Sequence, residues 1–196
     1  ITGTDLPNSK IGLNMCENNS SQVQMFCTIG VHPHEAKSCN GDTIEAIKKL
    51  VTSGGKHVVS IGETGLDFNR NYSPQDVQIE WFDRQVALAC ELSLPLFLHE
   101  RESHTAFMKV MQKHFVNGAL PVPAVVHCFT GTQDEAEVYI KNGFYLGFTG
   151  VICQYERGKP LRDIISNVVP LDRILIETDA PFMLPTNKLR DQYNGR

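Results

Sequence analysis

The sequence predicts an α/β fold, a TIM (β/α)8 barrel, on three observations. Short apolar runs rich in β-branched residues alternate with amphipathic stretches along the 196 residues. Several of these runs are apolar throughout, as strands of a parallel sheet are when helices cover both faces. Acidic residues and histidines follow at least four of the runs, spread over residues 63 to 179. An open doubly wound sheet gathers its functional residues at one switch point, so the barrel is favoured.

The strands are predicted from apolar runs bounded by polar, glycine or proline residues. Seven candidates are found, counting the opening residues: 1–4, 25–31, 57–63, 94–100, 123–129, 144–152 and 173–179. Eight strands close such a barrel, and the missing one is most easily placed before residue 1. The sequence therefore predicts one incomplete barrel domain over residues 1 to 196, with its first strand absent.

Amphipathic stretches between these runs predict the helices. They are expected over residues 43–51, 73–92, 103–114, 133–142 and 161–169. Ser73 is a candidate N-cap with Pro74 as the first helical residue, and Gly143 is a candidate helix end. Strand, helix, strand repetition requires crossover connections, and these favour a parallel sheet.

Composition narrows the functional classes. A net charge of −4 and a pI near 6.0 argue against a surface that coats duplex DNA, so any nucleic-acid contact must be local. The six cysteines contain no CxxC pair, which favours a reducing compartment. No stretch approaches the roughly 20 apolar residues that span a bilayer, so no membrane contact is expected. The expected location is the cytoplasm, with the nucleus as an alternative.

Four strand-like runs carry a residue that can bind a divalent cation. These residues are Glu63, His99, His127 and Asp179. A lone histidine after a strand is more often a core residue, but four such residues at one end of a barrel favour a shared site. Buried acids without a cation would also have raised pKa values. The sequence therefore predicts a divalent metal centre with these four ligands.

Further polar residues lie near the predicted ligands. Glu177 and Asp179 are two apart and point the same way in a strand, so Glu177 is expected to orient a ligand or to pair with Arg101. His32 and His34 also share a parity after an apolar run. His32 is a candidate phosphate or metal contact, and His34 is a weaker one.

Five motifs together resemble, in order, the TatD family of metal-dependent deoxyribonucleases. They are GVHPH at 30–34, GETGLDF at 62–68, HER at 99–101, HCFTG at 127–131 and ETDAP at 177–181. The resemblance implies a barrel of the metallo-dependent hydrolase type, a divalent metal and DNase activity, often 3′ to 5′ exonucleolytic. It assigns the same four residues as ligands. It also implies truncation at both ends, because the family's first strand and last stretch have no counterpart here.

The predicted reaction is hydrolysis of a DNA phosphodiester bond, with single-stranded ends preferred. One or two cations are expected, magnesium first, with manganese or zinc as alternatives. Glu63 and Asp179 are the predicted catalytic residues: Asp179 would accept the proton of the attacking water, and Glu63 would bridge two ions. The predicted substrate contacts are His32, His34, Asp67, Arg70 and Arg101, with Arg157 and Lys159 as weaker candidates. The expected partner is a DNA end, with no obligate protein partner.

Two alternatives remain open. The same barrel and ligand types serve metal-dependent amide and lactone hydrolases, and fold alone does not choose between the chemistries. The chain is alternatively a truncated, non-catalytic barrel fragment, since loss of the first strand would leave unpaired sheet edges.

Overall fold

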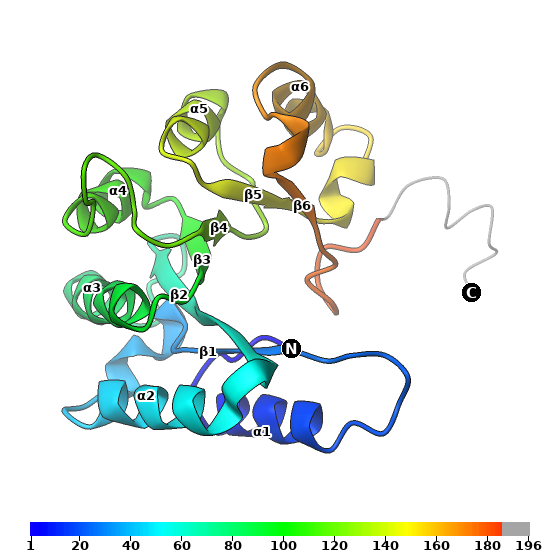
Figure 1. Ribbon diagram of the computed structural model, residues 1–196. Helices are drawn as coiled ribbons and strands as arrows, with labels where there is room; N and C mark the ends of the chain where they lie inside the picture. The colour runs from blue at the N-terminus through cyan, green and yellow to red at the C-terminus, as the bar shows by residue number, and fades with distance from the viewer. Residues whose placement is uncertain (186–196) are drawn as a thin grey trace. The chain divides into compact units, whose positions relative to one another are not determined.

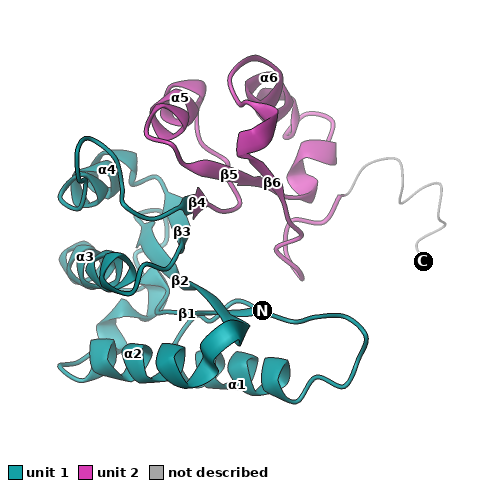
Figure 2. Ribbon diagram, in the orientation of Figure 1, with its two compact units in different colours: residues 1–124 teal, residues 125–196 magenta. Residues whose placement is uncertain are grey.

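The computed structural model describes residues 1 to 185, which form two compact units. Unit 1 is Ile1–Ala124, and unit 2 begins at Val125 (Figure 2). Each unit is described by itself. The prediction that residues 1 to 196 form a single barrel domain stays a prediction.

Unit 1 contains three parallel strands that pair in chain order, with helices between them (Figure 1). The strands are β1 (Cys27–Ile29), β2 (Val58–Asp67) and β3 (Leu96–Arg101). The α-helices are α1 (Leu6–Glu17), α2 (Thr43–Gly54), α3 (Gln75–Leu92) and α4 (His104–Gln112), with short 3-10 helices η1 (Pro33–Ser38) and η2 (Gly55–His57). The predicted alternation of strand and helix is confirmed here.

Unit 2 repeats this alternation (Figure 1). Its strands are β4 (Ala124–Val126), which starts at the last residue of unit 1, β5 (Tyr145–Phe148) and β6 (Ile174–Ile176), and the pairs β4–β5 and β5–β6 are parallel. Its helices are α5 (Gln133–Lys141) and α6 (Lys159–Asn167), with η3 (Gly150–Cys153) and η4 (Leu171–Arg173). The predicted end of α5 is confirmed, because Asn142 is its C-cap and Gly143 follows with φ 81°.

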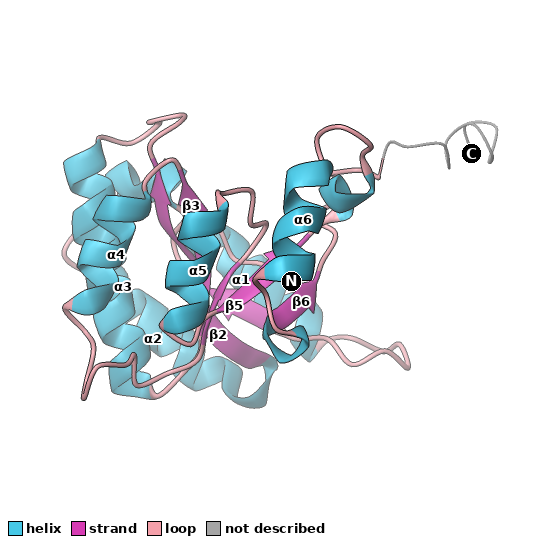
Figure 3. Cartoon of the chain, turned by 90° about the horizontal axis from the view of Figure 1, so that it is seen from above, coloured by secondary structure: helices cyan, strands magenta, loops and turns pink. Residues whose placement is uncertain are grey.

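The core of unit 1 fills the space between helices and strands with large apolar side chains. Helices α3 and α4 lie side by side in both views (Figures 1 and 3). Phe82 of α3 stacks on Phe107 of α4 with ring centroids 5.0 Å apart, and both rings are almost fully buried. Such aromatic pairs stabilise a core beyond the area they bury.

The structure differs from the sequence analysis at three places in unit 1. Residues 1–4 form no strand. The Ile1 carbonyl accepts a hydrogen bond from the Thr28 N–H, but the Gly3 N–H donates to the Thr28 hydroxyl and not to a backbone carbonyl, so no ladder of backbone hydrogen bonds forms. Six strands are therefore found among residues 1–185, instead of the seven expected. Helix α1 was not predicted. Ser73 does not cap α3, because its hydroxyl donates to the His34 carbonyl and accepts from the Lys37 N–H. Pro74 is the N-cap instead of the first helical residue, and α3 begins at Gln75.

Strand β2 carries an irregularity at the position that the sequence singles out. Ile61 pairs with Leu96 and Thr64 with Leu98 of β3, so β2 holds one extra residue there, a bulge that contains Glu63. Bulges re-aim side chains, often next to functional sites. The prediction that Glu63 ends its strand was wrong, because β2 continues to Asp67.

Gly65 permits the close approach of β2 to β3. Its φ is 145°, and a Cβ there would overlap the backbone carbonyl oxygen of His99. Only glycine combines that backbone conformation with that contact.

Among the described residues, no helix is long and apolar enough to cross a membrane.

We predict that Gly65→Ala destabilises the protein. The substitution adds a steric overlap with β3 to a strained φ, and each effect costs about 1 to 3 kcal/mol. Chemical denaturation followed by circular dichroism measures the change in the unfolding free energy. Gly41→Ala is the matched control, because a Cβ at Gly41 meets nothing within 4 Å. Equal stability of the two variants would contradict the account.

Candidate metal centre

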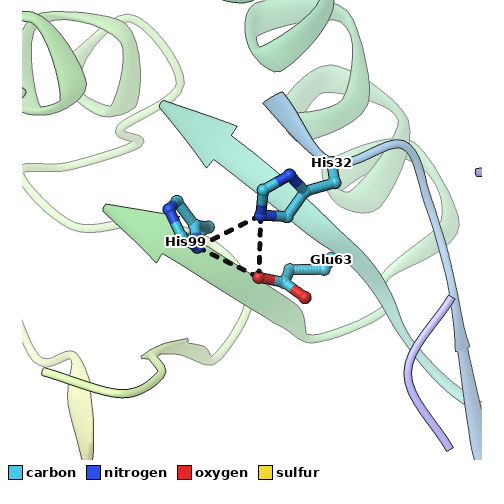
Figure 4. Close-up of side chains that lie close together, drawn as sticks. All are labelled: His32, Glu63 and His99. Atoms are coloured by element: carbon cyan, nitrogen blue, oxygen red, sulfur yellow. Dashed lines mark hydrogen bonds and ion pairs between the residues drawn. The ribbon is translucent and has the colours of Figure 1, made fainter. Parts of the chain in front are cut away.

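Two imidazole rings of unit 1 converge on one carboxylate oxygen (Figure 4). Glu63 Oε1 lies 3.3 Å from His32 Nε2 and 3.1 Å from His99 Nδ1. The two ring nitrogens are themselves 3.3 Å apart. His32 follows β1, Glu63 lies in the bulge of β2, and His99 lies in β3, so three consecutive parallel strands supply the cluster.

The spacing of the three atoms fits ligands of one cation. Ligands about 2.1 Å from a metal lie about 3.0 Å apart along an octahedral edge and about 3.4 Å apart along a tetrahedral edge. The observed separations of 3.1 to 3.3 Å fall between these values. Carboxylate and imidazole are also a donor set that magnesium, manganese and zinc accept to different degrees.

The burial of this cluster favours the binding of a cation by its side chains over their contact with water. His32 and Glu63 are 9% and 7% exposed. Burial lowers the pKa of His32, although the hydrogen bond to Glu63 opposes that shift. A neutral imidazole offers a lone pair to a cation, and a cation compensates the buried Glu63 carboxylate.

A second carboxylate lies behind the cluster. Asp67 is 1% exposed, and its Oδ2 lies 2.7 Å from His34 Nε2 and 3.4 Å from His99 Nε2. Burial opposes ionisation of Asp67, but the nearby His99 imidazole and the hydrogen bonds from the Arg70 N–H and His34 outweigh it and lower its pKa. Asp67 is therefore a carboxylate at neutral pH, in contact with two imidazoles.

Two buried glutamines of α3 hold the backbone on which these side chains stand. Gln85 accepts from the Val31 N–H and donates to the Val31 carbonyl and the Thr64 hydroxyl. Gln78 accepts from the Asp67 N–H and donates to the Asp67 carbonyl. Sequence reasoning missed both, because glutamine on an amphipathic helix indicates the solvent face; only their place in line with buried Phe82 hints otherwise.

Unit 2 contains a smaller cluster built around His127. Glu177 Oε2 lies 3.3 Å from His127 Nδ1, and its Oε1 accepts the Cys128 N–H at 2.5 Å. Burial and then the Asp179 and Glu177 carboxylates raise the pKa of the Cys128 thiol to about 12. Asp179 itself has a left-handed φ of 51° just beyond β6. Glu177 therefore orients His127, one of the two roles expected for it.

The structure brings together part of the predicted site. Glu63 and His99 meet in unit 1, with His32 as a third candidate ligand, and His127 and Asp179 lie in unit 2. That His127 and Asp179 join the same ion stays a prediction.

The residues predicted to contact the substrate differ in how exposed their side chains are. Arg101 is half-buried at the end of β3, and Arg70 is exposed, with its backbone N–H donating to Asp67. His34 and Asp67 contact each other. Arg157 and Lys159 are exposed in unit 2. Roles in substrate binding stay predictions for all of them.

One class of protein combines parallel strands that alternate with helices and a carboxylate–imidazole cluster carried by those strands. It is the class of TIM-type barrels with a divalent metal centre at the strand ends. Solved structures agree: a TatD-family hydrolase from Entamoeba histolytica superposes with a TM-score of 0.84 at 28% identity, over 95% of this chain and 62% of that one. A TatD homologue from Escherichia coli K12 gives 0.81 at 29% identity, over 93% and 67%.

Sequence comparison gives the family. The model of the family described as "TatD related DNase" matches residues 1–195. A curated relative from Erwinia tasmaniensis, named 3′-5′ ssDNA/RNA exonuclease TatD, is 43% identical over 94% of this chain and 68% of its own length. The chain belongs to the TatD family of metal-dependent nucleases, and its fold is the TIM-type barrel fold of that family. The chain thus spans about two thirds of the length of these relatives.

We predict that His32→Ala and Glu63→Gln each weaken Mn²⁺ binding by more than about 100-fold, because loss of a direct ligand exceeds the 10- to 100-fold cost of losing an outer partner. Calorimetric titration with Mn²⁺ measures the affinity. His57→Ala is the control, since His57 lies in η2 and is not part of the cluster. Unchanged affinity in both cluster variants would exclude this metal centre.

Proposed function

We propose that the protein is a metal-dependent deoxyribonuclease that hydrolyses DNA phosphodiester bonds from single-stranded 3′ ends. The observation that carries the proposal is the contact of Glu63, His32 and His99 at ligand spacing, in a chain that matches the TatD family over nearly its whole length. The relatives' name, 3′-5′ ssDNA/RNA exonuclease, supports the polarity and the single-stranded substrate.

Each residue has a defined task in this proposal. Glu63, His99 and His32 hold a divalent cation, with magnesium favoured by the carboxylate and manganese or zinc by the imidazoles. A cation supplies Lewis acidity there, which lowers the pKa of water and neutralises charge on the phosphoryl group in the transition state. His127 and Asp179 would complete the ligand set, and Glu63 would also hold a second ion.

The remaining residues act on the nucleic acid. Asp179 accepts the proton of the attacking water. Arg101 and Arg70 contact the flanking phosphates, as guanidinium groups do with paired hydrogen bonds. His34 is a further phosphate contact beside the cluster. The negative net charge restricts these contacts to the pocket, which suits a protein that engages one DNA end.

The cysteines support a reducing location. All six are free thiols, none of them in a disulfide. We therefore place the activity in the cytoplasm.

We predict that Asp179→Asn and His127→Ala each reduce the rate of DNA hydrolysis by at least about 100-fold, because each removes a ligand or the proton acceptor. The assay follows a 5′-labelled single-stranded oligonucleotide with Mg²⁺, and EDTA should abolish cleavage in the unaltered protein. Asp134→Asn, an exposed acid in the first turn of α5, is the control.

Two results, one from this assay and one from a parallel assay with amide and lactone substrates, would contradict the proposal. One is turnover in both variants at the unaltered rate. The other is hydrolysis of amide or lactone substrates by a protein that leaves every phosphodiester intact, which would favour the alternative chemistry on the same barrel.

We predict that phosphorothioate linkages at the 3′ end protect the oligonucleotide, whereas the same linkages at the 5′ end do not. Cleavage from the 3′ end must pass the modified bonds first, so the label should remain in full-length strand. Gel analysis of both substrates in parallel decides the polarity. Protection by the 5′ modification alone would reverse it.

A further inference from the structure

The loop between β2 and α3 carries an exposed aromatic ring beside the candidate metal cluster. Tyr72 lies in this loop, and its ring centroid is 4.7 Å from that of His34, in a T-shaped contact. The His34 ring lies 4.3 Å, centroid to centroid, from the ring of His32, one of the three candidate ligands. A single imidazole ring therefore links Tyr72 to the cluster.

Exposure distinguishes Tyr72 from most other aromatic side chains of unit 1. Within residues 1–124, two side chains of phenylalanine, tyrosine or tryptophan are exposed, Tyr72 at 59% and Phe26 at 38%. Phe26 directly precedes β1, whereas His32 follows that strand, so Phe26 lies at the strand end opposite to the cluster. Tyr72 is thus the exposed ring of residues 1–124 that a substrate at the cluster could contact.

Hydrogen bonds hold the backbone of this loop in place. The Lys37 ammonium donates to the Tyr72 carbonyl at 3.0 Å. The hydroxyl of the next residue, Ser73, donates to the His34 carbonyl at 2.8 Å and accepts from the Lys37 N–H at 3.0 Å. The loop is tied on both counts to η1, which carries His34 and Lys37. A ring on a fixed loop loses little conformational freedom on binding, so the position of Tyr72 is set before a ligand arrives.

Exposed cations accompany the ring. Lys37 reaches the Tyr72 carbonyl, and Arg70 lies two residues earlier in the same loop. Cations that contact phosphates position a nucleic-acid strand, and aromatic rings between such contacts stack on its bases. In a protein of net charge −4, cations beside an exposed ring fit a nucleotide better than they fit an uncharged aromatic ligand.

We propose that Tyr72 is a base-stacking platform, which binds the face of a nucleobase next to the phosphate that reaches the metal centre. The proposal rests on the proposed nuclease function and adds a contact with a base, because His34, Arg70 and Arg101 are assigned to phosphates. Every base has a π face, so this contact serves strands of any sequence. A base inside a duplex has both faces covered by its neighbours, so the contact favours single-stranded ends.

The test combines one change in the protein with one change in the strand. Tyr72→Ala should weaken the binding of a single-stranded oligonucleotide by about 5- to 150-fold, which corresponds to about 1 to 3 kcal/mol. An abasic site at one of the last three positions should cost the unaltered protein a similar factor. At that position the abasic site should cost Tyr72→Ala less than about threefold, because the two changes remove the same contact.

Fluorescence anisotropy with Mg²⁺ measures these affinities. The strand carries phosphorothioate linkages at its 3′ end, and a gel confirms that it stays intact. Tyr72→Phe should bind within about threefold of the unaltered protein, because it keeps the ring. Phe26→Ala is the matched control, since it removes an exposed ring at the opposite strand end, and it should also stay within about threefold.

Two further measurements separate stacking from a structural role. Calorimetric titration should give Tyr72→Ala the Mn²⁺ affinity of the unaltered protein, because Tyr72 lies outside the cluster. In the unaltered protein, 5-iodouracil at each of the last three positions of the strand should cross-link on irradiation to an aromatic ring stacked on it. Mass spectrometry should place the cross-link on Tyr72, and this result needs no variant.

The outcomes distinguish this proposal from the proposed function. The role of Tyr72 would be overturned by an equal loss of affinity in Tyr72→Ala for the complete strand and for all three abasic strands, or by cross-links that are absent or confined to other residues. An equal loss of Mn²⁺ and strand affinity in Tyr72→Ala would also overturn it, because the ring would then act on the cluster through His34. An unaltered protein that binds no single strand would instead remove the proposed function.

Discussion

The contact of one buried carboxylate oxygen with two imidazole nitrogens is the constraint on which the rest of this structure depends. Glu63 Oε1, His32 Nε2 and His99 Nδ1 lie 3.1 to 3.3 Å from one another, and both His32 and Glu63 are buried. Removing a carboxylate from water is costly unless an opposite charge compensates it. A divalent cation compensates it and supplies the chemistry of a hydrolase, so electrostatics and function require the same site.

The local fold of unit 1 serves this contact. The bulge in β2 re-aims Glu63, Gly65 lets β2 approach the backbone of His99, and two buried glutamines of α3 hold the chain beside His32 and at Asp67. Each of these features departs from a regular sheet or an ordinary helix surface. Natural proteins depart from local rules in this way mainly at functional sites, where the gain is a preorganised arrangement of charged groups.

The sequence predicted the fold class and the ligand types but not the way in which the ligands are held. Glu63 and His99 stood out because each follows an apolar run. Helix α1 was missed because its buried face includes Ser9, Gly12 and Cys16, which produce no apolar period. The link from Asp67 to His99 was beyond prediction, since it depends on a bulge that shifts strand register and no composition signal marks a bulge. Glu177 contacts His127, as a residue that orients a ligand would, but the strand parity behind that expectation was wrong, because β6 ends at Ile176 before both Glu177 and Asp179.

Membership in the TatD family supports a nuclease, and the site in unit 1 gives that activity its physical basis. The most direct measurement of the central claim is a crystal structure of the protein soaked with Mn²⁺, with anomalous diffraction data. The account predicts an anomalous peak about 2.2 Å from Glu63 Oε1, His32 Nε2 and His99 Nδ1, the usual range for such ligands. The account would be contradicted if the three side chains contacted one another directly and no anomalous density lay among them.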